Sequence, residues 1–405
     1  MKHASLLARI DPDFCLDFLA RMVRYKSYSA TDGERALAEY MHLQMSELGL
    51  DSRLLPVPGE RFNAVGVWRG EGGGQRLLFN GHLDTNPVTE GWTVDPWGGE
   101  IDREFIYGIG VSNMKAGDAA YFCAVKTLID AGVRLKGDVI LTYVVGELQG
   151  GIGTIAAIEQ GVTADCFINS EPTDLQALTM HAGSLMFSIE LTGDTRHLSK
   201  REAAVDALGA AAALVPRINA MRFSGARSEE HLKLNRGHAG NLHAALGREL
   251  HEWRSPQVAD FARIRGSARF APGQEVEGVL ADLRRLLDEL EAEYPGLRAE
   301  LINESERLPL MRPFEVDRDA AIVQAVNQAY RQVRGSEQPT GVFAPACFFG
   351  TDAAHLSHLL GIPGVVCGPG GEFNTMPDER VRISDFLDMV RIYLLAILEI
   401  CEPLE

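Results

Sequence analysis

Features typical of secreted, membrane-bound and nucleic-acid-binding proteins are missing from this sequence. The six cysteines are scattered and form no C-x-x-C pair, so they indicate reduced core thiols rather than a disulfide framework. No apolar run approaches the ~20 residues that span a bilayer. Residues 1–15 lack the apolar core of a signal peptide. We therefore expect a cytoplasmic protein without a membrane anchor.

Positive charge is also scarce in this chain. It has 39 Lys and Arg against 56 Asp and Glu, which gives a formal net charge of −17. No basic block interrupts this excess of acidic residues. Nucleic acid and anionic membrane surfaces are therefore poor partners for the protein.

The length of 405 residues exceeds the usual size of one domain, so two domains are expected. In the first 182 residues, apolar strand patterns alternate with helical patterns. The strands are expected at 51–56, 62–68, 76–81, 138–145 and 166–168, and the helices at 13–26, 32–49 and 114–131. This alternation predicts an α/β fold with a mixed, mostly parallel sheet that helices cover on both faces.

The pattern changes near residue 183 and returns near residue 303. In between, strands at 186–191, 259–270 and 297–302 and helices at 202–221 and 275–293 predict a small α+β insert. Afterwards, helices at 317–333, 351–360 and 384–401 and strands at 341–349 and 364–367 resume the first pattern. The predicted domains are residues 1–182 together with 303–405, and residues 183–302.

Polar residues gather where predicted strands end, which is where open α/β sheets bind ligands. A histidine, a carboxylate and a carboxamide oxygen can together hold a divalent ion, and a spare glutamate nearby can deprotonate water. For any one residue, a polar cap on a strand end is the more ordinary interpretation, whereas the joint order favours a metal site. The groups are His82 with Asp84, Asn113, Glu147, Glu171, and Gly368-Pro369-Gly370 with Asn374.

The order of these motifs resembles the zinc-dependent metallopeptidase and deacylase family of acetylornithine deacetylase, succinyl-diaminopimelate desuccinylase, glutamate carboxypeptidase and aminoacylase. The resemblance covers nearly the whole chain. It rests on Gly81-His82-Leu83-Asp84-Thr85, Tyr107-Gly108-x-Gly110, Gly150-Gly151-x-Gly153-Thr154, Glu171-Pro172-Thr173, Gly350-Thr351-Asp352-Ala353, Gly368-Pro369-Gly370 and Pro377-x-Glu379. It implies a catalytic α/β domain split by a lid that often dimerises, so a homodimer is expected, with residues 183–302 as the lid.

The chain departs from this family where a second metal would bind. Relatives normally bind two ions that share a bridging aspartate. The resemblance places His82 and Glu171 at the first ion and Glu147 at the catalytic base. The bridging aspartate, however, is replaced by Asn113. The second ion's glutamate and histidine are replaced by Leu148 and Asn374.

These replacements imply a remodelled centre with a single divalent ion, zinc or manganese, and no second site. The expected ligands are His82, Asn113 and Glu171. Asp84 lies close enough in sequence to orient the His82 ring, and Gly368 and Asn374 are expected to contact substrate. A site that has lost its ion is the alternative.

The resemblance implies functional roles for two residues of the insert. His197 resembles a lid histidine that stabilises the oxyanion in the partner subunit's site, and Arg269 stands where relatives grip a substrate carboxylate. A surface histidine and a solvated strand end are the alternatives. No motif includes His181, His238, His355 or His358, which we interpret as core or surface residues.

The resulting hypothesis is a hydrolase that cleaves a C–N bond in a small carboxylate-bearing molecule, with Glu147 as general base. The bond is an amide, or an aryl amine as in an aminohydrolase of nitroanthranilate that has a similar scaffold. The alternative, from another functional class, is a catalytically inactive homologue that binds a small acid.

Overall fold

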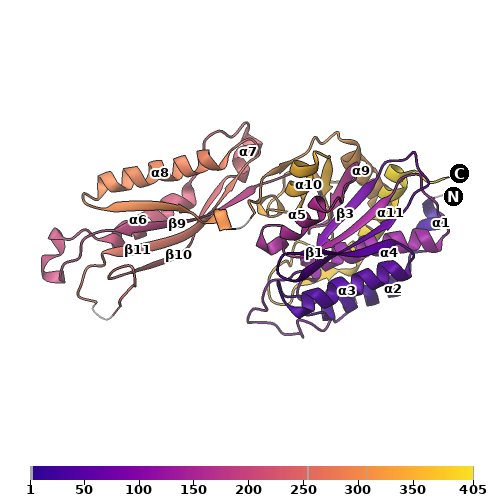
Figure 1. The fold of residues 1–405 in the computed structure, drawn as a ribbon, viewed down its shortest axis with the longest axis horizontal. Helices are drawn as coiled ribbons and strands as arrows, with labels where there is room; N and C mark the ends of the chain where they lie inside the picture. The colour runs from indigo at the N-terminus through magenta and orange to yellow at the C-terminus, as the bar shows by residue number, and fades with distance from the viewer. Residues whose placement is uncertain (1–2, 253–254, 308, 405) are drawn as a thin grey trace. The chain divides into compact units, whose positions relative to one another are not determined.

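The computed structural model describes residues 3–252, 255–307 and 309–404, which belong to two compact units (Figure 1). The first unit comprises Met1–Met180, Phe314–Ala346 and Thr351–Glu405. The second comprises His181–Pro313 and Cys347–Gly350. The polar groups that follow the predicted strands therefore all lie in the first unit, whereas His197 and Arg269 lie in the second.

An eight-stranded sheet forms the centre of the first unit, in the order β1-β2-β5-β3-β6-β15-β7-β14. Strands β5, β3, β6 and β15 run parallel, while β1 and β2 are antiparallel at one edge. Every residue of these four parallel strands is buried, as expected where both faces of a sheet are covered. The predicted mixed, mostly parallel sheet is confirmed. The strands are β1 (Asp51–Val57), β2 (Arg61–Trp68), β3 (Leu77–His82), β5 (Val139–Val144), β6 (Cys166–Asn169), β7 (Ala177–Leu178), β14 (Thr340–Gly341) and β15 (Gly364–Val366).

Helices cover both faces of this sheet, as two adjacent residues of β3 show. The Phe79 ring stacks on Tyr121 of α4 (Ala116–Asp130) with 5.3 Å between ring centroids, whereas the Asn80 amide donates to the Thr154 hydroxyl of α5 (Ile152–Glu159) at 3.0 Å. Successive side chains of a strand point to opposite faces, so α4 and α5 lie on opposite sides of the sheet. Among the residues described, no helix combines the length and apolar character needed to cross a bilayer.

The helices of the first unit form two groups, one in the main hydrophobic core and the other made of α5 and α10 (Ala353–Leu360). Those that share the main hydrophobic core are α2 (Pro12–Arg24), α3 (Asp32–Glu47), α4 (Ala116–Asp130), α9 (Ala321–Arg334) and α11 (Ile383–Cys401). Helices α5 (Ile152–Glu159) and α10 (Ala353–Leu360) contact each other. Shorter elements of this unit are α1 (His3–Leu7), β4 (Phe105–Tyr107), β13 (Phe314–Glu315) and β16 (Arg380–Arg382).

The second unit contains a four-stranded antiparallel sheet in the order β10-β11-β9-β12. Leu185, Phe187, Ile189 and Leu191 alternate along β9 and are fully buried in a core with apolar residues of α6 and α8. The elements are β9 (Gly183–Thr192), α6 (Ala207–Ala220), α7 (Glu229–Leu234), β10 (Arg236–Ala245), β11 (Phe261–Phe270), α8 (Val276–Glu293) and β12 (Arg298–Asn303); β8 (Met180–His181) joins the units in the chain. This is the α+β arrangement expected for the insert.

Two expectations about strands are wrong. The strand predicted over 341–349 is limited to Thr340–Gly341, because Pro345 cannot donate to a sheet and a 3-10 turn covers Ala346–Phe348. Strand β10 was not predicted at all. Its glycines and polar residues hide the strand pattern, and its register against β11 shifts between Ala239 and Asn241.

Candidate metal centre

Neighbouring parallel strands end at one edge of the first unit's sheet and bring predicted site residues together there. His82 is the last residue of β3, which lies between β5 and β6. Glu147 follows β5, Glu171 follows β6, and Gly368 follows β15. Since His82 is in register with Val144 near the end of β5, the strand ends are level. This carboxyl edge is the usual ligand-binding edge of an α/β sheet.

The two ring nitrogens of His82 have different surroundings. Nδ1 lies 2.9 Å from the backbone carbonyl oxygen of Asp84. A carbonyl can only accept a hydrogen bond, so Nδ1 carries a proton. Nε2 lies 3.2 Å from Asn113 Oδ1, 3.7 Å from Glu171 Oε1 and 3.9 Å from Glu147 Oε2. In the neutral ring, the free lone pair is therefore on the nitrogen that three oxygens face.

This cluster has the dimensions of a metal site. The ligand atoms of His82, Glu147 and Glu171 all lie within 4.8 Å of one another. Ligands about 2.0–2.2 Å from a tetrahedral zinc ion lie about 3.3–3.6 Å apart, close to the separations observed around Nε2. His82 is 1% exposed, Glu147 9% and Glu171 5%, so these groups are withdrawn from water. The donor set therefore fits a divalent cation.

Asp84 lies beside the His82 ring, and its backbone is closer to Nδ1 than its side chain is: the carbonyl oxygen lies at 2.9 Å and Oδ1 at 3.6 Å. Its carbonyl, rather than its carboxylate, accepts from the imidazole. The fully buried carboxylate accepts from the backbone N–H groups of Gly146, Glu147 and Leu148 at 2.9, 3.3 and 3.2 Å. Ser29 Oγ also donates to it at 2.9 Å. Asp84 thus fixes both the His82 ring and the turn that carries Glu147.

A tight turn at Val111–Lys115 presents Asn113 to His82. The backbone N–H groups of Ser112 and Asn113 donate to Glu379 Oε1 at 2.8 and 3.0 Å. The peptide bond between Asn113 and Met114 is cis. Glu379 belongs to the Pro377-x-Glu379 motif, to which sequence analysis gave no role. Its position shows that this motif anchors the turn that carries Asn113.

Buried negative charge dominates the cluster. Burial alone would lower the pKa of His82, but the carboxylates of Glu171, Asp84 and Glu147 outweigh it and raise that pKa to about 10. Burial also raises the pKa of Glu171 to about 7 and holds the pKa of Glu147 well above its usual value. In the absence of a cation, these shifts favour the protonated forms of His82, Glu171 and Glu147. A bound divalent ion would replace those protons and stabilise the ionised acids.

One acidic residue beside this centre was not among the predicted site residues. Asp118, on α4, is fully buried and accepts from the Tyr121 hydroxyl at 3.2 Å. A Cβ at Gly81 would lie 1.8 Å from Asp118 Oδ1, so only glycine fits in the strand next to His82. Burial holds the pKa of Asp118 well above its usual value. The sequence feature that could have identified Asp118 is an acidic residue on the apolar face of an alanine-rich helix.

The structure also places the other predicted residues of the first unit. The Gly368 amide donates to Thr173 Oγ1 at 3.1 Å, which holds this loop against the segment that carries Glu171. Asn374 has a buried Oδ1 without a hydrogen-bond partner among the described residues. The Leu148 side chain is 37% exposed, although its backbone N–H is held by Asp84. The substrate contacts expected of Gly368 and Asn374 stay predictions.

His197 and Arg269 are parts of the second unit. The exposed His197 begins the 3-10 turn Leu198–Ala203, and its Nδ1 lies 3.0 Å from Ser199 Oγ. Arg269 is in β11, directly opposite Arg236 of β10. The roles expected of His197 and Arg269 stay predictions.

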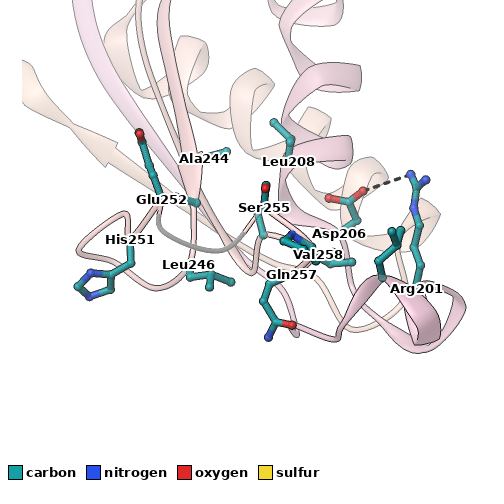
Figure 2. A pocket seen from close by; sticks show the side chains of 14 residues that line it. Arg201, Asp206, Leu208, Ala244, Leu246, His251, Glu252, Ser255, Gln257 and Val258 are labelled. Atoms are coloured by element: carbon teal, nitrogen blue, oxygen red, sulfur yellow. Dashed lines mark ion pairs between the residues drawn. The ribbon is translucent and has the colours of Figure 1, made fainter.

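The second unit also contains a cavity of about 360 Å³ (Figure 2). It is lined by apolar residues such as Leu208, Leu246 and Val258 and by the ion pair of Arg201 with Asp206 at 3.8 Å. None of the predicted site residues lines it, and it lacks the combination of imidazole and buried acids found around His82. We therefore assign the candidate chemistry to the first unit.

The chain is similar to known hydrolases over most of its length. The model of Peptidase family M20/M25/M40 matches residues 78–399. Acetylornithine deacetylase from Edwardsiella ictaluri is 28% identical over 92% of this chain and 94% of its own. N-formyl-4-amino-5-aminomethyl-2-methylpyrimidine deformylase from Halalkalibacterium halodurans is 24% identical over 98% of this chain and 97% of its own.

A solved structure has the same fold. The tripeptidase from Staphylococcus aureus superimposes with a TM-score of 0.77 at 20% identity, covering 97% of this chain and 99% of its own. At this identity, the likeness concerns the fold alone.

Proposed function

The chain belongs to peptidase family M20/M25/M40, a family of metal-dependent hydrolases that act on C–N bonds, and from this membership we propose a one-metal hydrolase. In this proposal a single divalent ion is held by His82, Asn113 and Glu171, and Glu147 is the general base. The first unit is catalytic, and the second is a lid through which two copies dimerise.

One observation carries the proposal: the Nε2 atom of buried His82 faces the oxygens of Asn113, Glu171 and Glu147 at 3.2–3.9 Å. Three protein ligands are a common number for a catalytic site, since positions stay open for water and substrate. Both positions expected to ligate only a second ion are altered: Leu148 has no donor, and Asn374 offers a carboxamide instead of an imidazole. A second ion would therefore find too few ligands.

In such a site a divalent ion polarises the carbonyl that is attacked and lowers the pKa of water. The residues of the chain supply the remaining functions. Glu147 accepts a proton from the attacking water and returns it to the leaving nitrogen. Burial raises the pKa of the Glu147 carboxyl, which is the direction that makes a carboxylate a stronger base. Asp84 keeps Glu147 in place through the backbone of the turn.

For the substrate we propose a small carboxylate-bearing molecule with an amide or aryl C–N bond. Arg269 is proposed to bind the carboxylate, and His197 to stabilise the oxyanion in the partner subunit's site. Gly368 and Asn374 complete the proposed substrate contacts. The buried Oδ1 of Asn374, which has no hydrogen-bond partner among the described residues, supports this assignment, since a substrate N–H group would satisfy it.

The substitution Glu147→Gln tests the proposal. Gln keeps the size of the side chain but cannot take a proton, so turnover should fall about 10²–10⁴-fold, the usual contribution of a general base. Bound metal should stay at the wild-type level. Activity is measured on N-acyl amino acids, dipeptides and aryl amines, and metal by elemental analysis of the purified protein. Glu159→Gln, at an exposed site on α5, is the control and should change neither quantity.

Two results would overturn this assignment. Full activity of Glu147→Gln would remove Glu147 as the base. Loss of metal from Glu147→Gln would make Glu147 a ligand instead. A wild-type chain that binds no metal and turns over nothing would favour the inactive binding homologue.

A further inference from the structure

The turn that carries Glu147 is flanked by glycines and closed by its own backbone: the Gly150 N–H donates to the Glu147 carbonyl at 2.9 Å, and the Gly151 N–H donates to the Gly146 carbonyl at 3.1 Å. The 3-10 turn Glu147–Gln149 is preceded by Gly146 and followed by Gly150 and Gly151, all with positive φ values of 75°, 84° and 75°. Its first half is fixed by the three N–H groups that donate to Asp84. In the second half, the Arg61 guanidinium donates to Gln149 Oε1. Because glycine is permissive in conformation, the placement of the Gly150–Gly151 side also depends on partners outside the turn.

Two side chains at the start of α10 contact this region: His355 bonds the turn itself, and Asp352 bonds the first turn of α5, just after it. His355 Nε2 lies 2.9 Å from the carbonyl oxygen of Gly150, so this nitrogen donates to it. Asp352 Oδ2 accepts from the Thr154 hydroxyl at 2.7 Å. His355 and Asp352 are 5% and 1% exposed, and both are therefore withdrawn from solvent.

The same two side chains also enclose Gly151. A Cβ at Gly151 would lie 2.4 Å from Asp352 Oδ1 and 2.6 Å from His355 Nε2. Asp352 Oδ1 is buried and has no hydrogen-bond partner in the part of the chain that the structure describes. A buried oxygen without a hydrogen bond costs free energy of folding, so its position against the Gly151 backbone calls for a functional explanation.

We propose that His355 and Asp352 are positioning residues that hold the Gly150–Gly151 side of the turn and thereby aim the Glu147 carboxylate at the His82 cluster. The inference rests on the proposed function, in which Glu147 is the base. It gives a role to a histidine that sequence analysis assigned to the core or the surface. Neither residue touches the ion or the substrate in this proposal.

The test compares His355→Leu with His355→Gln, whose amide can donate to the Gly150 carbonyl. His355→Leu should lower kcat about 10–100-fold, the usual effect of losing an orienting partner, while KM and metal affinity stay within about twofold of wild type. Hydrogen exchange should accelerate only in peptides that cover residues 146–151. His355→Gln should restore kcat to within about threefold of wild type. His358→Leu, at an exposed position one turn later on the same helix, is the control and should behave as wild type.

Unchanged kcat and unchanged exchange in His355→Leu would overturn the inference. So would parallel losses of kcat, metal affinity and exchange protection across the first unit, since a general structural role predicts those. If His355→Leu does not fold, His355→Asn replaces it, because its shorter side chain does not reach Gly150. Failure of the proposed function is distinguishable: the wild type would then lack metal and turnover, while exchange at residues 146–151 would still decide whether His355 holds the turn.

Discussion

His82 organises the candidate site by facing a different partner with each ring nitrogen. Nδ1 is fixed by the Asp84 carbonyl, and Nε2 faces Asn113, Glu171 and Glu147. With a pKa of about 10, which the surrounding carboxylates cause against the effect of burial, the ring of the metal-free protein is protonated at neutral pH. A cation at Nε2 must therefore displace a proton.

Metal affinity should accordingly increase with pH. While the pH is below the pKa of a group that loses its proton to the metal, each increase of one pH unit should lower the apparent Kd of the metal about tenfold. His82, with its pKa of about 10, contributes one proton throughout pH 6–8, and Glu171 contributes further below its pKa of about 7. Titration of the apo protein with Mn²⁺ should give a slope of about one proton above pH 7 and a steeper slope below it. An affinity that does not depend on pH would show that His82 is not a ligand.

Sequence reasoning could identify His82, Glu147 and Glu171 because each follows an apolar strand run, and parallel strands end at one edge. It could not predict that the Asp84 carbonyl, rather than its carboxylate, orients His82. That choice depends on the three N–H groups after β5, which lie more than sixty residues away in the chain. Tertiary contacts of this kind leave no local pattern in a sequence.

At the scale of elements, the turn after β5 is held from two sides. Asp84, just after β3, accepts from its first three N–H groups, and α10 contacts its second half through His355. The turn that carries Glu147 is therefore held by contacts from these two elements in addition to its own backbone hydrogen bonds. We propose that the placement of Glu147 as the base depends on both flanking elements.

The substitution Asp84→Asn should weaken the first of these anchors. An amide has one acceptor oxygen instead of two and no charge, so about 1.5–3 kcal/mol of stability should be lost, the usual value for hydrogen bonds to a charged group. The midpoint temperature of thermal unfolding and kcat should both decrease. The control Asp51→Asn alters an exposed carboxylate that pairs with Arg69 at 2.9 Å and should cost less than about 0.5 kcal/mol. Equal effects of the two substitutions would contradict the role of Asp84.

Element prediction succeeded where periodicity was strong and failed where partners decide the conformation. Helix α8 and strands β3 and β5 are found close to their expected positions. The segment after Gly341 is apolar enough for a strand, but the pairing stops at Gly341, and Pro345 and the 3-10 turn Ala346–Phe348 follow. Strand β10 exists because β11 supplies its hydrogen bonds, although Gly237, Gly240 and Asn241 weaken its own preference for a strand.

At the scale of the whole molecule, the chain retains the fold of its family, and we propose that only the metal ligands have changed. Three separate positions, Asn113, Leu148 and Asn374, account for the proposed loss of one ion. They lie on different loops of the first unit, so one local change does not explain them together. His82, Glu147 and Glu171 remain, which is the reason for proposing a remodelled site rather than an inactive one.

Substitutions that bring back the family's second-metal ligands should restore binding of the second ion. The triple variant Asn113→Asp, Leu148→Glu and Asn374→His should bind about two equivalents of zinc, since it regains a bridging carboxylate and two further ligands. The exposed position of Leu148 makes a glutamate acceptable there. The double variant that retains Leu148 is the control and should bind one equivalent. A triple variant that also stays at one equivalent would show that these positions do not form a second site.

The most direct measurement of the central claim is the metal content of the wild-type chain after equilibration with Zn²⁺ or Mn²⁺. We predict about one equivalent per chain, reduced to background in His82→Ala. Two equivalents, or one equivalent that survives in His82→Ala, would contradict a one-metal site at His82.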